Sequence, residues 1–160
     1  MRLIVPTVAL LLAAPLAAKD SLGVFGDWGA FRDADPTRCY AIAMAEPSSA
    51  RRETQPFASV SDWPSRRVRG QLHIRLSRRL QQSPRIQLSI GGRRFAMNGG
   101  GSDGWADSAA SDAQIVAAMR SAASMSVSAT DARGNRFTDR YSLEGAATAI
   151  DAASVGCARR

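Results

Sequence analysis

Alternating apolar and polar residues on both sides of one glycine pair constrain the fold of this 160-residue chain most strongly. Residues 86–90 alternate apolar and polar side chains, Gly91-Gly92 follows at once, and residues 93–97 alternate again. Glycine accepts the positive φ angles of a two-residue hairpin turn, and successive side chains of a strand point to opposite faces. The pattern therefore predicts an antiparallel β-hairpin with one apolar face.

The same alternation recurs elsewhere in the chain. Residues 125–129 and 137–143 alternate on either side of the turn-forming segment 131–135, which predicts a second hairpin. Further strands are expected at residues 72–76, 39–45 and 57–62, and around Phe25 and Trp28. Strands that pair with their sequence neighbours favour an antiparallel β-sandwich or a partly open barrel.

One helix, and a second short one, are expected to pack on this sheet. Ser111 and Gln114 have the spacing of an N-terminal capping box. Apolar residues then recur on one face at helical spacing, at Ile115, Ala118, Met119 and Ala122. A further helical turn is predicted over residues 145–154, with Ala147 and Ile150 on one face.

The first 18 residues have the composition of a secretory signal peptide. Arg2 supplies a positive start, Leu3 to Leu16 is mostly apolar, and Ala17-Ala18 are small. The apolar stretch is shorter than the roughly 20 residues that a membrane-spanning helix needs. We expect residues 1–18 to be removed, leaving one mainly-β domain over residues 19–160 in the periplasm or outside the cell, with no transmembrane segment.

Two cysteines, Cys39 and Cys157, lie near the two ends of that domain. In an oxidising compartment an even pair favours a disulfide, and two free thiols are the alternative. Neither cysteine has the spacing of a redox motif or of a zinc site. We therefore expect no metal and no cofactor.

Basic residues are concentrated in one part of the chain. The net charge is +7, and residues 51–94 contain eleven arginines against Glu53 and Asp62. Candidates for an anion-binding face in this block are Arg66, Arg67, Arg69, Arg75, Arg78, Arg79, Arg93 and Arg94. Outside the cytoplasm the matching anions would be lipopolysaccharide, acidic lipid headgroups, cell-wall polymers or a host surface.

Two interpretations of this block are open. The arginines can form a binding face. Alternatively, they can simply solvate the polar sides of strands. The second interpretation would apply if arginine usage follows genome composition, since Lys19 is the only lysine. Nucleic acid is not the expected partner, because only Phe57 and Trp63 are interleaved with the arginines.

No catalytic residue is predicted. His73, the only histidine, falls on the polar side of its strand and is expected to be exposed. The glycine-rich segment 98–104 lacks a phosphate-loop ending and is expected to be a flexible connection. Asp139 shares strand parity with Phe137 and Tyr141, so we expect a buried structural acid bonded to an arginine or to backbone amides.

Several segments together resemble a known family. They are Cys39-Tyr40-Ala41-Ile42-Ala43, Ser59-Val60-Ser61, the run from Ile86 to Phe95, Gly104-Trp105-Ala106, the run from Asp112 to Met119, Ala132-Arg133-Gly134, the run from Thr138 to Gly145, and Cys157. In order and spacing they resemble the invasion-associated locus B family over nearly the whole chain after residue 18. Longer-studied members carry additional cysteines, which this chain lacks.

The resemblance implies an exported bacterial protein that is mainly β and has no known catalytic residues. Together with the charge pattern, it leads us to expect a non-enzymatic protein that binds an anionic envelope or surface component through the arginine block. The alternative is a small periplasmic hydrolase or a chaperone-like factor.

Overall fold

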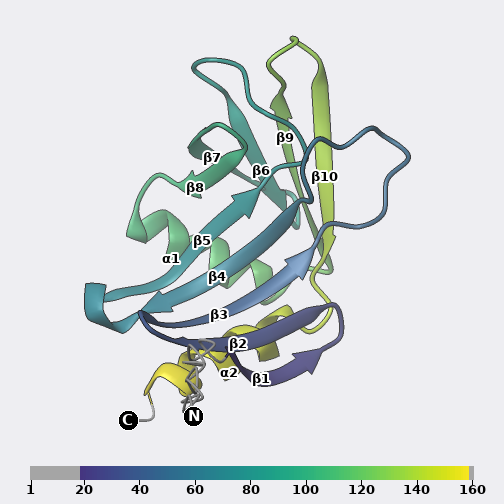
Figure 1. Ribbon diagram of the computed structural model, residues 1–160. Coiled ribbons are helices and arrows are strands. Elements are labelled where there is room, and N and C mark those ends of the chain that lie inside the picture. The colour runs from purple at the N-terminus through teal and green to yellow at the C-terminus, as the bar shows by residue number, and fades with distance from the viewer. Residues whose placement is uncertain (1–18, 159–160) are drawn as a thin grey trace, which may run out of the picture.

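The computed structural model describes residues 19–158, within which ten strands form a single antiparallel sheet (Figure 1). The strands are β1 (Lys19–Phe25), β2 (Trp28–Ala34), β3 (Thr37–Met44), β4 (Phe57–Trp63), β5 (Val68–Arg75), β6 (Ile86–Ile90), β7 (Arg93–Gly100), β8 (Asp103–Ala106), β9 (Ser124–Thr130) and β10 (Arg136–Ser142). The predicted antiparallel β fold with small helices is confirmed. The predicted signal peptide lies outside the described residues.

The strand order departs from sequence order in the second half of the sheet. The order is β1-β2-β3-β4-β5-β8-β7-β6-β9-β10, so β5 pairs with β8 and β6 pairs with β9. The sheet is not closed, but it curves until β10 meets the segment after β3, where the Glu46 N–H donates to the Arg140 carbonyl at 2.8 Å. Figure 1 shows β9 and β10 standing beside the upper ends of β3 to β5.

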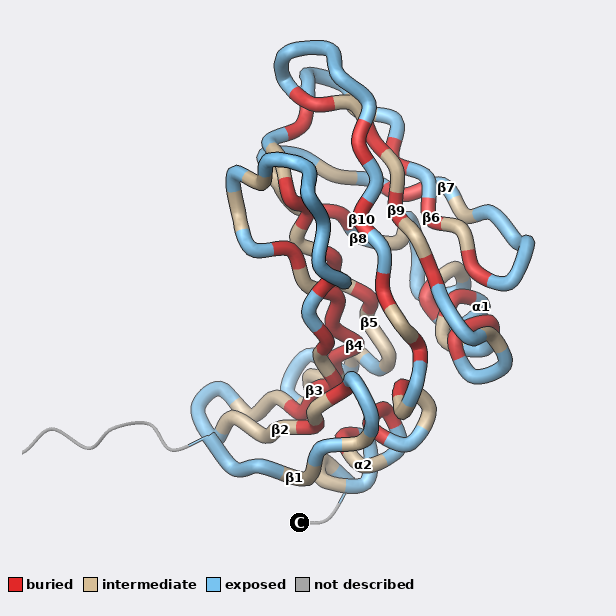
Figure 2. The backbone as a smooth tube through the Cα atoms, turned by 90° about the vertical axis from the view of Figure 1, so that its right-hand side faces the viewer, coloured by how far each residue is buried: buried red, intermediate tan, exposed pale blue. Residues whose placement is uncertain are grey.

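Strand alternation places the core on the inner side of the curved sheet. Along β9, Met125, Val127 and Ala129 are buried, while the serines between them are not. The same alternation is visible as red and paler segments along β9 and β10 in Figure 2. Trp28 is fully buried, and its indole N–H donates to the Ser142 carbonyl at 2.9 Å. Strand β2 is thereby joined to the end of β10.

Two α-helices cover parts of the inner side, α1 (Ala109–Met119) and α2 (Ala146–Ala158), and a short 3-10 turn (Pro64–Arg66) precedes β5. Ile115, Ala118 and Met119 of α1 are buried, as predicted. The predicted cap is wrong, because Ser108 is the extended N-cap residue and its hydroxyl accepts from the Ser111 N–H at 3.2 Å. The helix therefore begins before Ser111.

Helix α2 confirms the second predicted helical segment and extends past it. Its buried residues are Ala146, Ala149, Ile150 and Ala153, whereas Ala147 is only half-buried. The face of α2 that packs against β1, β2 and β3 therefore includes Ile150, as predicted, but not Ala147. No helix within residues 19–158 is long and apolar enough to cross a membrane.

Both glycine-rich segments form tight turns between strands. Gly91 and Gly92 have φ angles of 53° and 82° and connect β6 to β7, so the predicted hairpin is confirmed. The prediction of a flexible connection at residues 98–104 is wrong. Its first residues complete β7, and the chain turns at Gly101 (φ 62°) into β8, which pairs with both β7 and β5.

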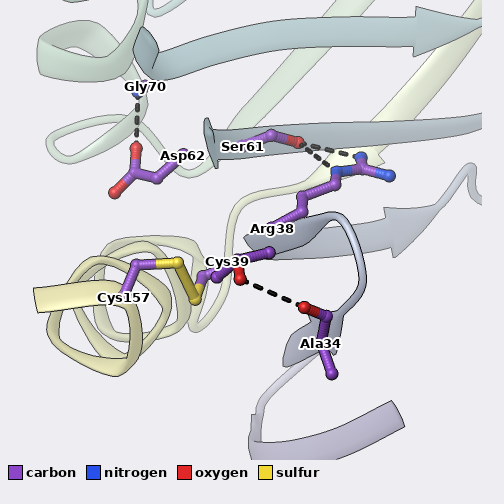
Figure 3. Close-up of a disulfide and its surroundings, with 8 residues drawn as sticks. Ala34, Arg38, Cys39, Ser61, Asp62, Gly70 and Cys157 are labelled. Carbon is purple, nitrogen blue, oxygen red and sulfur yellow. Dashed lines mark hydrogen bonds between the residues drawn. A yellow bond between two sulfur atoms is a disulfide. The ribbon is translucent and has the colours of Figure 1, made fainter. Parts of the chain in front are cut away.

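The predicted bridge between Cys39 and Cys157 is present, with Cα atoms 5.7 Å apart. It joins the buried inner side of β3 to the last turn of α2 (Figure 3). Nearby, the Arg38 guanidinium donates to the Ser61 hydroxyl at 2.9 Å, and the Gly70 N–H donates to the Asp62 carboxylate at 2.7 Å. The C-terminal helix is therefore fixed covalently to the centre of the first half of the sheet.

Candidate anion-binding surface

The outer side of β7, β6, β9 and β10 is a polar surface made by strand alternation. Ala96, Gln87, Ser128 and Thr138 lie opposite one another across the four strands. In these strands the only acid is Asp139, which points inward and is 3% exposed. The outer surface of this part of the sheet therefore carries hydroxyl, amide and guanidinium groups without a carboxylate.

Three arginines from separate segments converge on this surface. Arg85 precedes β6, Arg94 belongs to β7 and Arg136 begins β10, and all three are exposed. They line an open groove of about 680 Å³, which we call the arginine groove. Its other lining residues are Pro84, Ile86, Gln87, Ala96, Met97, Ser128, Ala129 and Thr130.

The positive charge of the arginine groove is not neutralised by any ion pair among residues 19–158. None of the groove's lining residues is acidic. Within residues 19–158, Arg85, Arg94 and Arg136 form no ion pair. Three like charges around one groove raise the local concentration of anions, and guanidinium groups donate well to carboxylate and phosphate oxygens. The groove can therefore bind an anion without first breaking an internal contact.

The eight arginines predicted to share one face are divided among three places. Arg66, Arg67 and Arg69 lie at the start of β5, and Arg75 lies at its end, roughly 20 Å away along an extended strand. Arg78 and Arg79 follow beyond that end. Arg93 and Arg94 begin β7. A continuous face is therefore not formed, because an extended strand carries sequence neighbours far apart.

Two of the predicted arginines are engaged in ion pairs. The Nε atom of Arg75 lies 2.6 Å from the Asp103 carboxylate, and a guanidinium nitrogen of Arg78 lies 3.0 Å from that of Asp131. Both acids come from other parts of the chain and are brought in by the fold. Arg75 and Arg78 are thus less available to a ligand than Arg94.

A second hollow collects part of the first arginine group. It measures about 660 Å³ and lies between the start of β5 and the two helices, with Arg67, Arg69 and Arg120 among its lining residues. Asp62 also lines it, and Arg120 is paired with Asp151 at 2.6 Å. Its positive charge is therefore opposed by nearby carboxylates, unlike that of the arginine groove.

The hydrogen bonds that Asp131 accepts predict how stability responds to acid. The Asn135 backbone N–H, then the Arg78 guanidinium and the Arg133 N–H, hold the pKa of Asp131 below its usual value. Because the folded pKa is depressed, the stabilisation is complete above the unfolded value of about 3.9 and is lost as the pH falls through the folded pKa.

The Asp131→Asn variant should therefore be less stable than wild type at neutral pH, and the difference should shrink in acid. Urea unfolding at a series of pH values measures it. Asp20→Asn is the matched control, since Asp20 is an exposed acid on β1 that forms no ion pair among the described residues. A difference for Asp131→Asn that stays constant from neutral to acidic pH would contradict this account.

The buried acid predicted at Asp139 is confirmed. Its carboxylate accepts from the Ser77 N–H at 2.8 Å, so its partner is a backbone amide. Asp139 thereby connects β10 to the segment that follows β5. This role is structural, because a carboxylate that is 3% exposed cannot reach a ligand.

His73 is not the exposed residue that was predicted. Its side chain is 21% exposed, and Nε2 lies 2.8 Å from the Asp103 carboxylate. Ser59 is its cross-strand neighbour on β4, which brings a serine, a histidine and an aspartate together. Ser59 is fully buried, however, and its hydroxyl has no hydrogen-bond partner among residues 19–158. The serine is therefore not arranged as a nucleophile activated by the histidine.

The structure gives no sign of a metal centre in its described part. Over residues 19–158, no three His, Cys, Asp or Glu side chains come together in a group that could hold an ion. Asp103 and Asp107, which flank the end of the glycine-rich segment, bond instead to His73 and Arg75 and to Ser111, respectively.

Sequence reasoning missed Arg85 and Arg136 as members of the site. Arg85 lies in the arginine-rich block but outside the eight candidates, and Arg136 lies more than forty residues beyond that block. The alternation of side chains along β10 could have placed Arg136 on the outer side. Phe137, Asp139 and Tyr141 point inward, so Arg136 points outward. The sequence pattern does not show which strands neighbour β10, because those strands pair over long distances in sequence.

No protein-family model, curated protein or solved structure matches the chain.

Proposed function

We propose that this is an exported, non-enzymatic envelope protein, related to the invasion-associated locus B family, that binds an anionic envelope or surface component through the arginine groove. The observation that carries the proposal is the convergence of Arg85, Arg94 and Arg136 on a groove without acids. The Cys39–Cys157 bridge supports export, because disulfides persist in oxidising compartments.

The alternative function, a small hydrolase, has less geometric support. Its only grouping of serine, histidine and acid in the described chain is Ser59, His73 and Asp103, and Ser59 is fully buried. A serine nucleophile needs a hydroxyl that reaches both its base and the substrate. A chaperone-like role would rest on large apolar patches, whereas the exposed large apolar residues, Val24, Met44, Trp105 and Val155, lie on separate elements.

Removing two groove arginines should weaken polyanion binding strongly. A basic residue near an anionic surface contributes about 1 kcal/mol, so Arg94→Ala with Arg136→Ala should bind roughly thirtyfold more weakly. Binding to inorganic polyphosphate, measured by fluorescence anisotropy of a labelled chain, tests this. Wild-type binding should also weaken from low to physiological ionic strength, because salt screens exposed charges.

The matched control is Arg51→Ala with Arg66→Ala, which removes the same charge from exposed positions outside the arginine groove. This control should keep most of the wild-type affinity. Equal losses in both double variants would mean that net charge, and not the groove, attracts the polyanion. Binding that ignores ionic strength would contradict the proposal altogether.

A further inference from the structure

An exposed tryptophan lies beside the arginine groove on the same side of the sheet. Trp105 of β8 is 39% exposed and lies directly opposite Asn98 of β7. Ala96, two residues before Asn98, points to the same side and lines the groove. The Cα atoms of Trp105 and Ala96 are therefore roughly 8 Å apart, close enough for one ligand to reach both.

The orientation of Trp105 is fixed by a chain of contacts across three strands. Its indole stacks on the His73 ring, with centroids 5.2 Å apart and planes at 17°. The Phe57 ring approaches His73 edge-on at 5.4 Å. His73 is bonded to Asp103, and Asp103 also accepts from Arg75 at 2.6 Å. A stacked and hydrogen-bonded neighbour therefore holds an aromatic side chain that remains 39% exposed to solvent.

A rigid, exposed aromatic side chain suits binding, because little conformational entropy is lost when a ligand covers it. A ligand for this surface needs a flat apolar face for the indole and negative groups for the arginines. It also needs hydroxyl or amide partners for Asn98, Gln87 and Ser128 on the intervening strands. A sugar ring bearing acidic groups has all three features, whereas polyphosphate and lipid headgroups lack the apolar ring face.

We propose that this surface binds an acidic polysaccharide, with one sugar ring stacked on Trp105 and neighbouring carboxylates or phosphates in the arginine groove. This inference rests on the proposed anion-binding function and gives it a ligand class. Single-stranded nucleic acid fits less well, because such sites stack successive bases on several aromatic side chains. Trp105 is the only aromatic residue among the exposed large apolar residues of the described chain.

The test compares three probes, which are polygalacturonate, inorganic polyphosphate and a single-stranded oligonucleotide. Trp105→Ala should bind polygalacturonate about tenfold more weakly and should bind polyphosphate as wild type does. Trp105→Phe keeps an aromatic ring and should recover most of the loss. The variant with alanine at Arg94 and Arg136 should lose affinity for both polyanions. Thermal unfolding of each variant confirms that it is folded.

Indole fluorescence gives a second readout that does not depend on a variant. Polygalacturonate should change the emission of wild type at low ionic strength, and the change should be absent from Trp105→Phe. If Trp105→Ala binds both polyanions as wild type does, the polysaccharide assignment is overturned while anion binding stands. Equally tight, Trp105-dependent binding of the oligonucleotide would also overturn it. If wild type binds none of the probes, the proposed function itself fails.

Discussion

Serine at both Cys39 and Cys157 is expected to lower the free energy of unfolding by about 4–5 kcal/mol. The bridge closes a loop of 118 residues, so its loss returns a large conformational entropy to the unfolded chain. The native contacts of α2 with β1, β2 and β3 do not depend on the sulfur atoms, so the variant should fold with its helix in place. Urea unfolding followed by circular dichroism measures the difference.

Wild type treated with a thiol reductant is the matched control for this variant, because it lacks the bridge but keeps both cysteines. Its unfolding midpoint should approach that of the double serine variant. Mass spectrometry under non-reducing conditions should find no free thiol in the untreated protein. Two free thiols, or an unchanged midpoint in the serine variant, would show that the bridge does not stabilise the fold as described.

Alanine at Gly145 should lower the free energy of unfolding by about 3 kcal/mol or more. Gly145 has a φ angle of 84°, which costs an L-residue roughly 1–2 kcal/mol. A Cβ atom there would also lie 1.8 Å from the carbonyl oxygen of Phe25, which belongs to the backbone and cannot rotate away. The hairpin of β1 and β2 would have to move from the start of α2.

Gly134→Ala is the matched control that separates the backbone cost of a positive φ angle from the steric cost at Gly145. Gly134 has a nearly identical φ angle of 85°, but a Cβ atom there would meet nothing within 4 Å. Its substitution should therefore show the backbone cost alone, roughly 1–2 kcal/mol. Thermal unfolding of the two variants compares them directly, and equal losses would mean that the close approach of Phe25 to Gly145 does not constrain the fold.

Local patterns predicted the elements of this fold well. The period-two alternation along residues 86–97 and 125–143 reports which face is buried, and Gly91-Gly92 supplies the turn conformation, so both hairpins could be placed. The helix cap was predicted wrongly at Ser111, because both Ser108 and Ser111 are residues that can cap a helix. Which of them caps α1 depends on where the extended chain of β8 ends.

The pairing of strands and the site that it creates could not be predicted in the same way. β6 lies between β7 and β9, and β8 is inserted beside β5, so residues distant in sequence become neighbours. The prediction that arginines close in sequence form one face failed for this reason. Arg75 and Arg78 form ion pairs with acids from other segments. Arg94 lines the same groove as Arg136, which lies more than forty residues further along the chain.

Because all the charged residues that line the groove are arginines, the pH profile of binding is a signature of the ligand. Guanidinium groups stay charged at every pH at which proteins remain folded, so the groove itself does not titrate. A ligand that carries carboxylates would lose affinity below about pH 4, and one that carries phosphomonoesters would weaken near about pH 6. Phosphodiesters and sulfates would show neither transition. The acid group of the natural partner is thus readable from a titration before the partner itself is isolated.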